Sequence, residues 1–73
     1  MHIQIVMDHT GDTQHQFDPN DEPAVARSRK RFQKLTDAGY IAAKRTGNDT
    51  SELIREFDPT ARETLFMPRL VGG

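Results

Sequence analysis

The segment 23–37 most constrains the fold, because it runs without a helix-breaking residue after a proline that a first helical turn tolerates. One stripe of this segment carries apolar or small side chains at helical spacing. The stripe consists of Val25, Ser28, Phe32 and Leu35. Asn20 is the expected N-cap, and Gly39 suits the position after the last turn. We therefore predict one main helix, with the residues before and after it forming a sheet.

The residues before this helix predict a β-hairpin. Three apolar residues alternate with other residues at the start of the chain, which indicates a strand with a buried face. They are Ile3, Ile5 and Met7. Gly11 can take the positive φ that a tight turn at 9–12 requires. The returning strand, 13–17, has Phe17 as its only large apolar residue, so we expect it at the edge of the sheet.

The residues after the helix predict three more strands. Segments 40–45 and 52–57 read as a hairpin joined by a turn of Gly, Asn and Asp. Segment 58–61 resembles a helix start, with room for one short turn. Segment 64–67 reads as the last strand, and Pro68 should end its pairing because proline has no N–H to donate.

This order of elements indicates an α+β fold, a ββαββ-turn-β chain whose helix crosses one face of a mixed sheet. If the last strand lies parallel to the first, the architecture is the β-grasp. We expect residues 1–68 to form this domain and residues 69–73 to form a flexible carboxyl-terminal tail. The expected core consists of Ile3, Ile5, Phe32, Leu35, Ile54 and Phe66.

Composition narrows the class of protein. The absence of cysteine excludes disulfides and thiolate zinc sites. No apolar run approaches the ~20 residues of a membrane-spanning helix. The start of the chain lacks a basic segment followed by a long apolar one, as a signal peptide would have, so we expect a cytoplasmic protein.

A domain this small has little room for a catalytic pocket, so we expect no catalysis by this chain. His2, His9 and His15 do not have the spacing of a metal site, so we expect no bound metal.

Charge is unevenly distributed, although the net charge is only −1. Seven of the ten lysines and arginines fall within residues 27–45, where Asp37 is the only acid. A basic helix face of this kind could bind nucleic acid or an acidic partner protein, although a solvated surface is the simpler explanation. Its residues are Arg27, Arg29, Lys30, Arg31 and Lys34.

The last five residues are Arg69-Leu70-Val71-Gly72-Gly73. Glycine has no Cβ, so a carboxylate on two glycines sits on a thin, flexible stem. Such a stem can enter a narrow channel in which any side chain would clash. This geometry suits activation or cleavage of a carboxyl-terminal group.

The element order and this ending together resemble ubiquitin and the ubiquitin-like proteins, over nearly the whole chain. The ending matches the family's Arg-Leu-x-Gly-Gly sequence position by position. Weaker likenesses are the opening Met1-His2-Ile3-Gln4-Ile5-Val6, the turn Thr10-Gly11-Asp12-Thr13, the segment Pro19-Asn20-Asp21 and the start of the last strand, Thr64-Leu65. The chain departs from ubiquitin in three ways. Its second strand has only one large apolar residue, Pro68 stands where the last strand would continue, and no clear Leu-Ile-Val patch is visible. These departures favour a ubiquitin-like protein over ubiquitin itself, and they are compatible with a prokaryotic member of the family.

The resemblance implies a modifier or a sulfur carrier that is itself a substrate, without a cofactor of its own. A partner enzyme would use ATP to adenylate the carboxylate of Gly73, which would then pass to a cysteine thiol or receive sulfur. Gly72 would let the backbone lie flat in the partner's channel, and Leu70 and Arg69 would contact an apolar pocket and an acid there. The expected partners are the activating enzyme and conjugating or deconjugating enzymes, with the chain itself a monomer.

Overall fold

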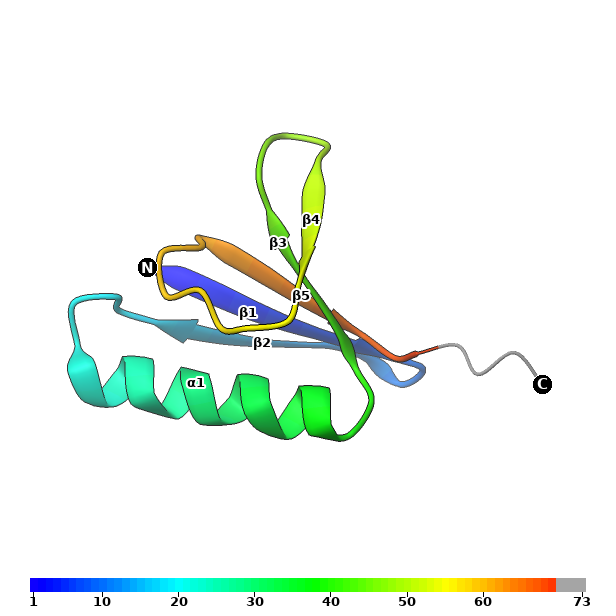
Figure 1. Cartoon of the computed structure of the whole chain (residues 1–73), viewed down its shortest axis with the longest axis horizontal. Helices are drawn as coiled ribbons and strands as arrows, with labels where there is room; N and C mark the ends of the chain where they lie inside the picture. Colours follow the sequence, from blue (N-terminus) through cyan, green and yellow to red (C-terminus); the bar gives the residue numbers. More distant parts are fainter. Residues whose placement is uncertain (70–73) are drawn as a thin grey trace.

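The computed structural model describes residues 1–69, which form a five-stranded sheet with one helix lying across one face (Figure 1). The elements in chain order are β1 (His2–Asp8), β2 (Gly11–Phe17), α1 (Glu22–Asp37), β3 (Ile41–Arg45), β4 (Ser51–Ile54) and β5 (Glu63–Met67). The strands lie in the order β2-β1-β5-β3-β4. β1 and β5 run parallel, and the other neighbouring pairs are antiparallel. This confirms the predicted α+β class and the β-grasp arrangement.

The core lies between α1 and the sheet. Its buried centre consists of Val6, Phe32, Ala42 and Phe66, against which Leu35, Tyr40, Ile54 and Phe57 pack. Phe66 is 0% exposed, and its ring meets that of Phe32 edge-on at a centroid distance of 5.6 Å. The prediction for Phe32 and Phe66 is confirmed, with Leu35 and Ile54 at the margin of the core.

The predicted placement of Ile3 and Ile5 in this core is wrong. Both residues are only partly buried, while Gln4 and Val6 are buried beneath the helix. The cause is the register with β5, which pairs Val6 with Phe66 and so turns both side chains toward the helix. Ile3 and Ile5 therefore point to the opposite face of the sheet.

Gln4 is a fully buried polar residue whose amide is satisfied on both sides. Its Nε2 donates to the backbone oxygen of Ser28 at 3.1 Å, and its Oε1 accepts from Nη1 of Arg31 at 2.9 Å. A buried amide without partners would destabilise the fold, so these two bonds explain how β1 can place Gln4 beneath the helix. They also fix α1 to the central part of the sheet.

The turn and cap residues adjust the predicted boundaries. Gly11 and Gly39 take positive φ angles of 127° and 98°, as expected. Asp21, one residue after the predicted Asn20, caps α1 by accepting from the backbone N–H of Ala24 at 3.4 Å. Asn20 and Asp21 are adjacent and both carry a side-chain oxygen that can accept a hydrogen bond from the first helical turn, so the sequence places the cap only to within one residue.

β4 ends at Ile54, earlier than the predicted 52–57. The reason is that Phe57 leaves the strand direction to pack its ring against Phe17 and Phe32, at centroid distances of 6.3 and 5.9 Å. The expected helix start at 58–61 is a turn, in which Oδ1 of Asp58 accepts from the N–H and the hydroxyl of Thr60. This connection runs from β4 to β5.

An ion pair joins that connection to β3. Nζ of Lys44 lies 2.9 Å from Oδ2 of Asp58. The hydrogen bonds from Thr60, and then the Lys44 ammonium, lower the pKa of Asp58 to about 2. The ionised carboxylate is therefore favoured in the folded state.

We predict that Asp58→Asn, which keeps an acceptor for Thr60 but removes the charge, lowers the free energy of unfolding by about 1 kcal/mol at neutral pH. Because the folded pKa lies below the ordinary value, this contribution is complete above about pH 5 and disappears as the pH falls toward 2. Urea unfolding from pH 7 to pH 2 checks it, with Asp49→Asn in an exposed turn as the control. A wild-type acid dependence unchanged in Asp58→Asn would contradict the assignment.

We also predict that Phe66→Ala lowers the free energy of unfolding by about 3–5 kcal/mol, because it removes a fully buried ring. Leu53→Ala is the matched control, since that side chain is 71% exposed, and it should change stability by less than about 0.5 kcal/mol. Denaturant unfolding followed by circular dichroism measures both. Equal effects of the two substitutions would refute the placement of β5 in the core.

Candidate functional site

The chain leaves the sheet from its central region. β5 lies between β1 and β3 and ends at Met67, so Pro68 ends its pairing as predicted. Since Val6 pairs with Phe66, the chain leaves the sheet at the end where the turn between β1 and β2 lies (Figure 1). Arg69 follows as an exposed residue. The proposed activation residues Gly72 and Gly73, with Leu70 and Val71, lie outside the described residues.

Arg69 borders a groove of about 470 Å³. The groove lies over the end of α1 and the hairpin of β3 and β4, and it is lined by Thr36, Tyr40, Ile41, Ala42, Leu53, Ile54, Arg55 and Arg69. Leu53 and Ile41 are large apolar residues exposed on the surface. Apolar side chains therefore lie beside the point where the carboxyl-terminal segment begins.

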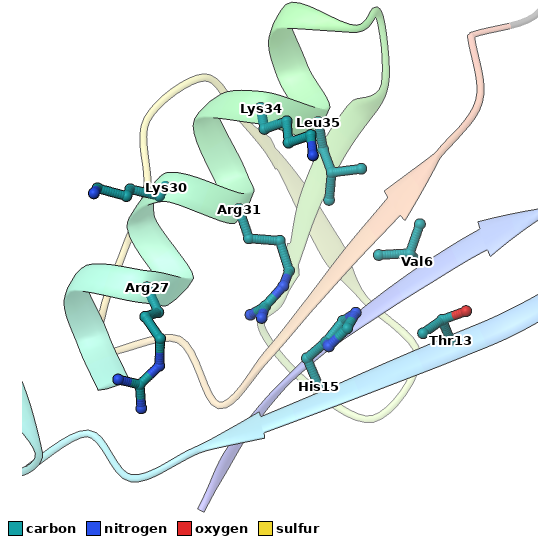
Figure 2. Close-up of a pocket in the computed structure, with 8 residues that line it drawn as sticks. All are labelled: Val6, Thr13, His15, Arg27, Lys30, Arg31, Lys34 and Leu35. Atoms are coloured by element: carbon teal, nitrogen blue, oxygen red, sulfur yellow. The ribbon is translucent and has the colours of Figure 1, made fainter. Parts of the chain in front are cut away.

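A second groove, of about 520 Å³, lies between α1 and β2 (Figure 2). Four cationic side chains line it from the helix at spacings that place them on one side. They are Arg27, Lys30, Arg31 and Lys34. Val6 and Leu35 supply apolar surface, and Thr13 and His15 come from β2. We call this feature the basic groove.

Arg31 is the most fixed of these cations. It is partly buried, and its bond to the buried Gln4 holds its guanidinium between the helix and the sheet. Figure 2 shows Arg31 extending from α1 toward His15 on β2. Partial burial and then the charge of Arg31 lower the pKa of His15 below its ordinary value. The imidazole is therefore neutral at physiological pH beside a fixed positive charge.

Arg29 does not belong to the basic groove, although the sequence grouped it with the other four cations. Its guanidinium carbon lies 5.5 Å from the ring centroid of Phe57, on another side of α1. The helical period explains the separation, because Arg29 lies about 160° around the axis from both Arg27 and Arg31. The predicted basic face is thus divided in two: four of its cations line the basic groove, and Arg29 contacts Phe57 on another side of the helix.

The three histidines have different surroundings. Nδ1 of His2 lies 3.0 Å from the backbone oxygen of Pro59, and the ring meets Phe17 edge-on. His9 lies exposed in the turn after β1. Only His15 lines the basic groove, and sequence reasoning missed this role. His15 and Phe17 lie two residues apart on β2, so their side chains point to the same face of the sheet. Because Phe17 is the large apolar residue of this strand and is buried, the alternation places His15 on the helix side.

Within residues 1–69, no helix is long and apolar enough to cross a membrane. The same residues contain no cluster of three or more histidine, aspartate or glutamate side chains arranged to hold a metal ion.

Comparisons of the chain with protein-family models, with curated proteins and with solved structures find no match. Function is therefore inferred from the geometry of the described residues and from the carboxyl-terminal sequence.

Proposed function

We propose that the protein is a ubiquitin-like modifier or sulfur carrier whose Gly73 carboxylate is activated by an ATP-dependent partner enzyme. One observation carries the proposal: the sequence Arg69-Leu70-Val71-Gly72-Gly73 follows the central strand of a β-grasp body, separated from it only by Pro68. The proposal takes Gly73 as the last residue of the active chain, whether translation or cleavage produces that end.

The geometry at the end of β5 supports this proposal. Strand pairing ends at Met67, and Arg69 is exposed to a partner. The neighbouring groove offers the exposed side chains of Ile41 and Leu53 as an apolar contact surface. A partner that receives the tail would meet this surface at the same time, which would favour its recognition of the whole domain.

In the proposed reaction the protein supplies the nucleophile and the partner supplies the catalysis. The carboxylate oxygen of Gly73 attacks the α-phosphate of ATP, pyrophosphate leaves, and an acyl adenylate forms. A thiol or a sulfur donor then displaces AMP. Gly72 permits the narrow passage, Leu70 and Val71 contact the channel walls, and Arg69 pairs with an acid at its mouth.

The proposal predicts that the protein supports ATP–pyrophosphate exchange with its cognate activating enzyme, because formation of the adenylate is reversible. Gly72→Val should abolish the exchange by blocking the channel, and deletion of Gly72 and Gly73 should do the same. Incorporation of labelled pyrophosphate into ATP, with intact mass of the product, measures these effects.

Arg29→Glu is the control, because it reverses a charge beside Phe57 without altering residues 69–73, and it should leave the exchange unchanged. Circular dichroism should show that all variants remain folded. Exchange that persists without Gly72 and Gly73 would refute the proposed function, as would failure of the wild-type chain with every activating enzyme encoded alongside it.

A further inference from the structure

We propose that the basic groove between α1 and β2 binds a short chain of linked phosphates, either inorganic or carried by a nucleoside. Three features of the groove support this ligand: its cations have no counter-charge, its polar side chains can all donate hydrogen bonds, and its dimensions match a compact anion. The proposed activation of the carboxyl terminus does not require such a site, so the groove adds a second role to the protein.

The cations of the groove are not neutralised by neighbouring acids. They are Arg27, Lys30, Arg31 and Lys34. The residues that line the groove include no carboxylate. Within residues 1–69, the side-chain ion pairs involve only Lys44 and Arg45 of β3 as cations. The groove therefore keeps an uncompensated positive field that attracts an anion.

Every polar side chain that lines the groove can donate a hydrogen bond. The guanidinium and ammonium groups only donate, and the hydroxyl of Thr13 and the neutral imidazole of His15 each carry one donor. Ionised phosphate oxygens accept such bonds, and a guanidinium can bind two of them at once. The lining is thus complementary to a ligand that is rich in acceptors.

Arg31 is held ready for this contact. Its Nη1 donates to Oε1 of the buried Gln4, which fixes the direction of the side chain. A guanidinium has five N–H donors, so donors remain for a phosphate after this bond is made. Because Arg31 is already partly ordered, its binding to an anion costs less side-chain entropy than that of a freely moving arginine.

The dimensions of the groove suit two or three linked phosphates. Residues 27 and 34 are about 10 Å apart along the helix axis, given the rise of an α-helix. Three linked phosphates fit within this length and bring about four negative charges to the four cations. The volume of the groove, about 520 Å³, is that of a small-molecule site.

The four cations do not occupy equivalent places. Figure 2 shows Arg31 extending toward His15, whereas Lys30 is directed away from β2. Lys30 also lines a hollow on the neighbouring side of α1, so it stands at the rim of the basic groove. We therefore expect Arg27, Arg31 and Lys34 to make the closest phosphate contacts.

The apolar part of the groove gives a place for a nucleoside. Val6 and Leu35 line it, and Val6 is the cross-strand neighbour of Thr13. His15 is instead the neighbour of Gln4, close to the fixed Arg31. Phosphates bound near Arg31 would leave an attached nucleoside over Val6 and Leu35, whereas an inorganic chain would leave this surface uncovered.

Two other acidic ligands match the groove less well. An extended peptide presents side chains on one face only about every 7 Å, so at most two of its carboxylates would meet the cations. Single-stranded nucleic acid is bound by stacking its bases on aromatic side chains, and the lining residues include no Phe, Tyr or Trp.

The test is isothermal titration calorimetry of the intact protein with sodium tripolyphosphate, without magnesium and at about 50 mM salt. We expect a dissociation constant at or below about 100 µM. Sulfate, which brings only two charges, should bind at least about tenfold more weakly. Deletion of Gly72 and Gly73 should leave binding unchanged, so this result is independent of the proposed function.

A matched pair of charge reversals places the site. Arg27→Glu should weaken tripolyphosphate binding by about tenfold, whereas Arg29→Glu, on another side of the same helix, should change it by less than about twofold. Both side chains are exposed, so both variants should fold, which circular dichroism checks.

His15 reports on the occupied groove. The charged groups that face it from α1 are the four groove cations, and its neighbours on β1, Gln4 and Val6, do not titrate. A phosphate beside it favours the imidazolium and raises its pKa. Nuclear magnetic resonance titration with saturating tripolyphosphate should therefore show a higher pKa for His15 and little change for His9, which is exposed in the turn after β1.

Adenosine triphosphate, again without magnesium, distinguishes the two sources of the phosphates. Tighter binding than that of tripolyphosphate, with shifts of the methyl signals of Val6 and Leu35, would assign the site to a nucleotide, and equal or weaker binding would assign it to an inorganic chain. The proposal would be overturned by equal losses in Arg27→Glu and Arg29→Glu, by sulfate binding as tightly as tripolyphosphate, by an unchanged His15 pKa, or by tighter binding of oligothymidylate or oligoglutamate.

Discussion

The parallel pairing of β1 with β5 is the contact on which the rest of the structure depends. It brings together segments from the two ends of the chain and aligns Val6 with Phe66 beneath the helix. Phe66 in turn contacts Phe32 of α1, so one register joins the first strand, the last strand and the helix. β3 then pairs with the other side of β5 and extends the sheet.

Both candidate sites follow from this pairing. Because β5 lies at the centre of the sheet, the chain emerges near the hairpin turn of β1 and β2 and beside the apolar surface formed by Ile41 and Leu53. The same register places Gln4 under the helix, where it holds Arg31 toward His15. The groove that Arg69 borders and the basic groove are therefore separate surfaces built on one core.

The order and type of the elements could be predicted because each depends on local information. Helical spacing, alternating strands and the glycines at positions 11 and 39 are all read within a few residues. Expected ends differed by a few residues where tertiary packing decided them, as when Phe57 turned inward and shortened β4.

The buried face of β1 could not be predicted in the same way. Ile3, Ile5 and Met7 make one face more apolar, yet the face with Gln4 and Val6 is buried. Only the pairing with a strand about sixty residues later decides between the faces, and a buried glutamine is acceptable only because Ser28 and Arg31 are in reach.

The basic groove, too, could be predicted from the sequence only in part. The cluster of helical cations was visible in the sequence, but the separation of Arg29 from the stripe and the approach of His15 depend on how α1 lies over the sheet. Helical spacing alone can group residues on a helix face, whereas a groove needs the opposing strand. The role of residues 70–73 is a proposal from the sequence, because these residues lie outside the described part of the chain.

The most direct test of this account is a set of nuclear Overhauser effects between the backbone protons of β1 and β5 in the intact protein. The account predicts contacts of the parallel register between Ile5 and Leu65 and between Val6 and Phe66, together with slow amide exchange in both strands. Absence of these contacts, or an antiparallel pattern between the two strands, would contradict the core, the exit of the tail and the groove together.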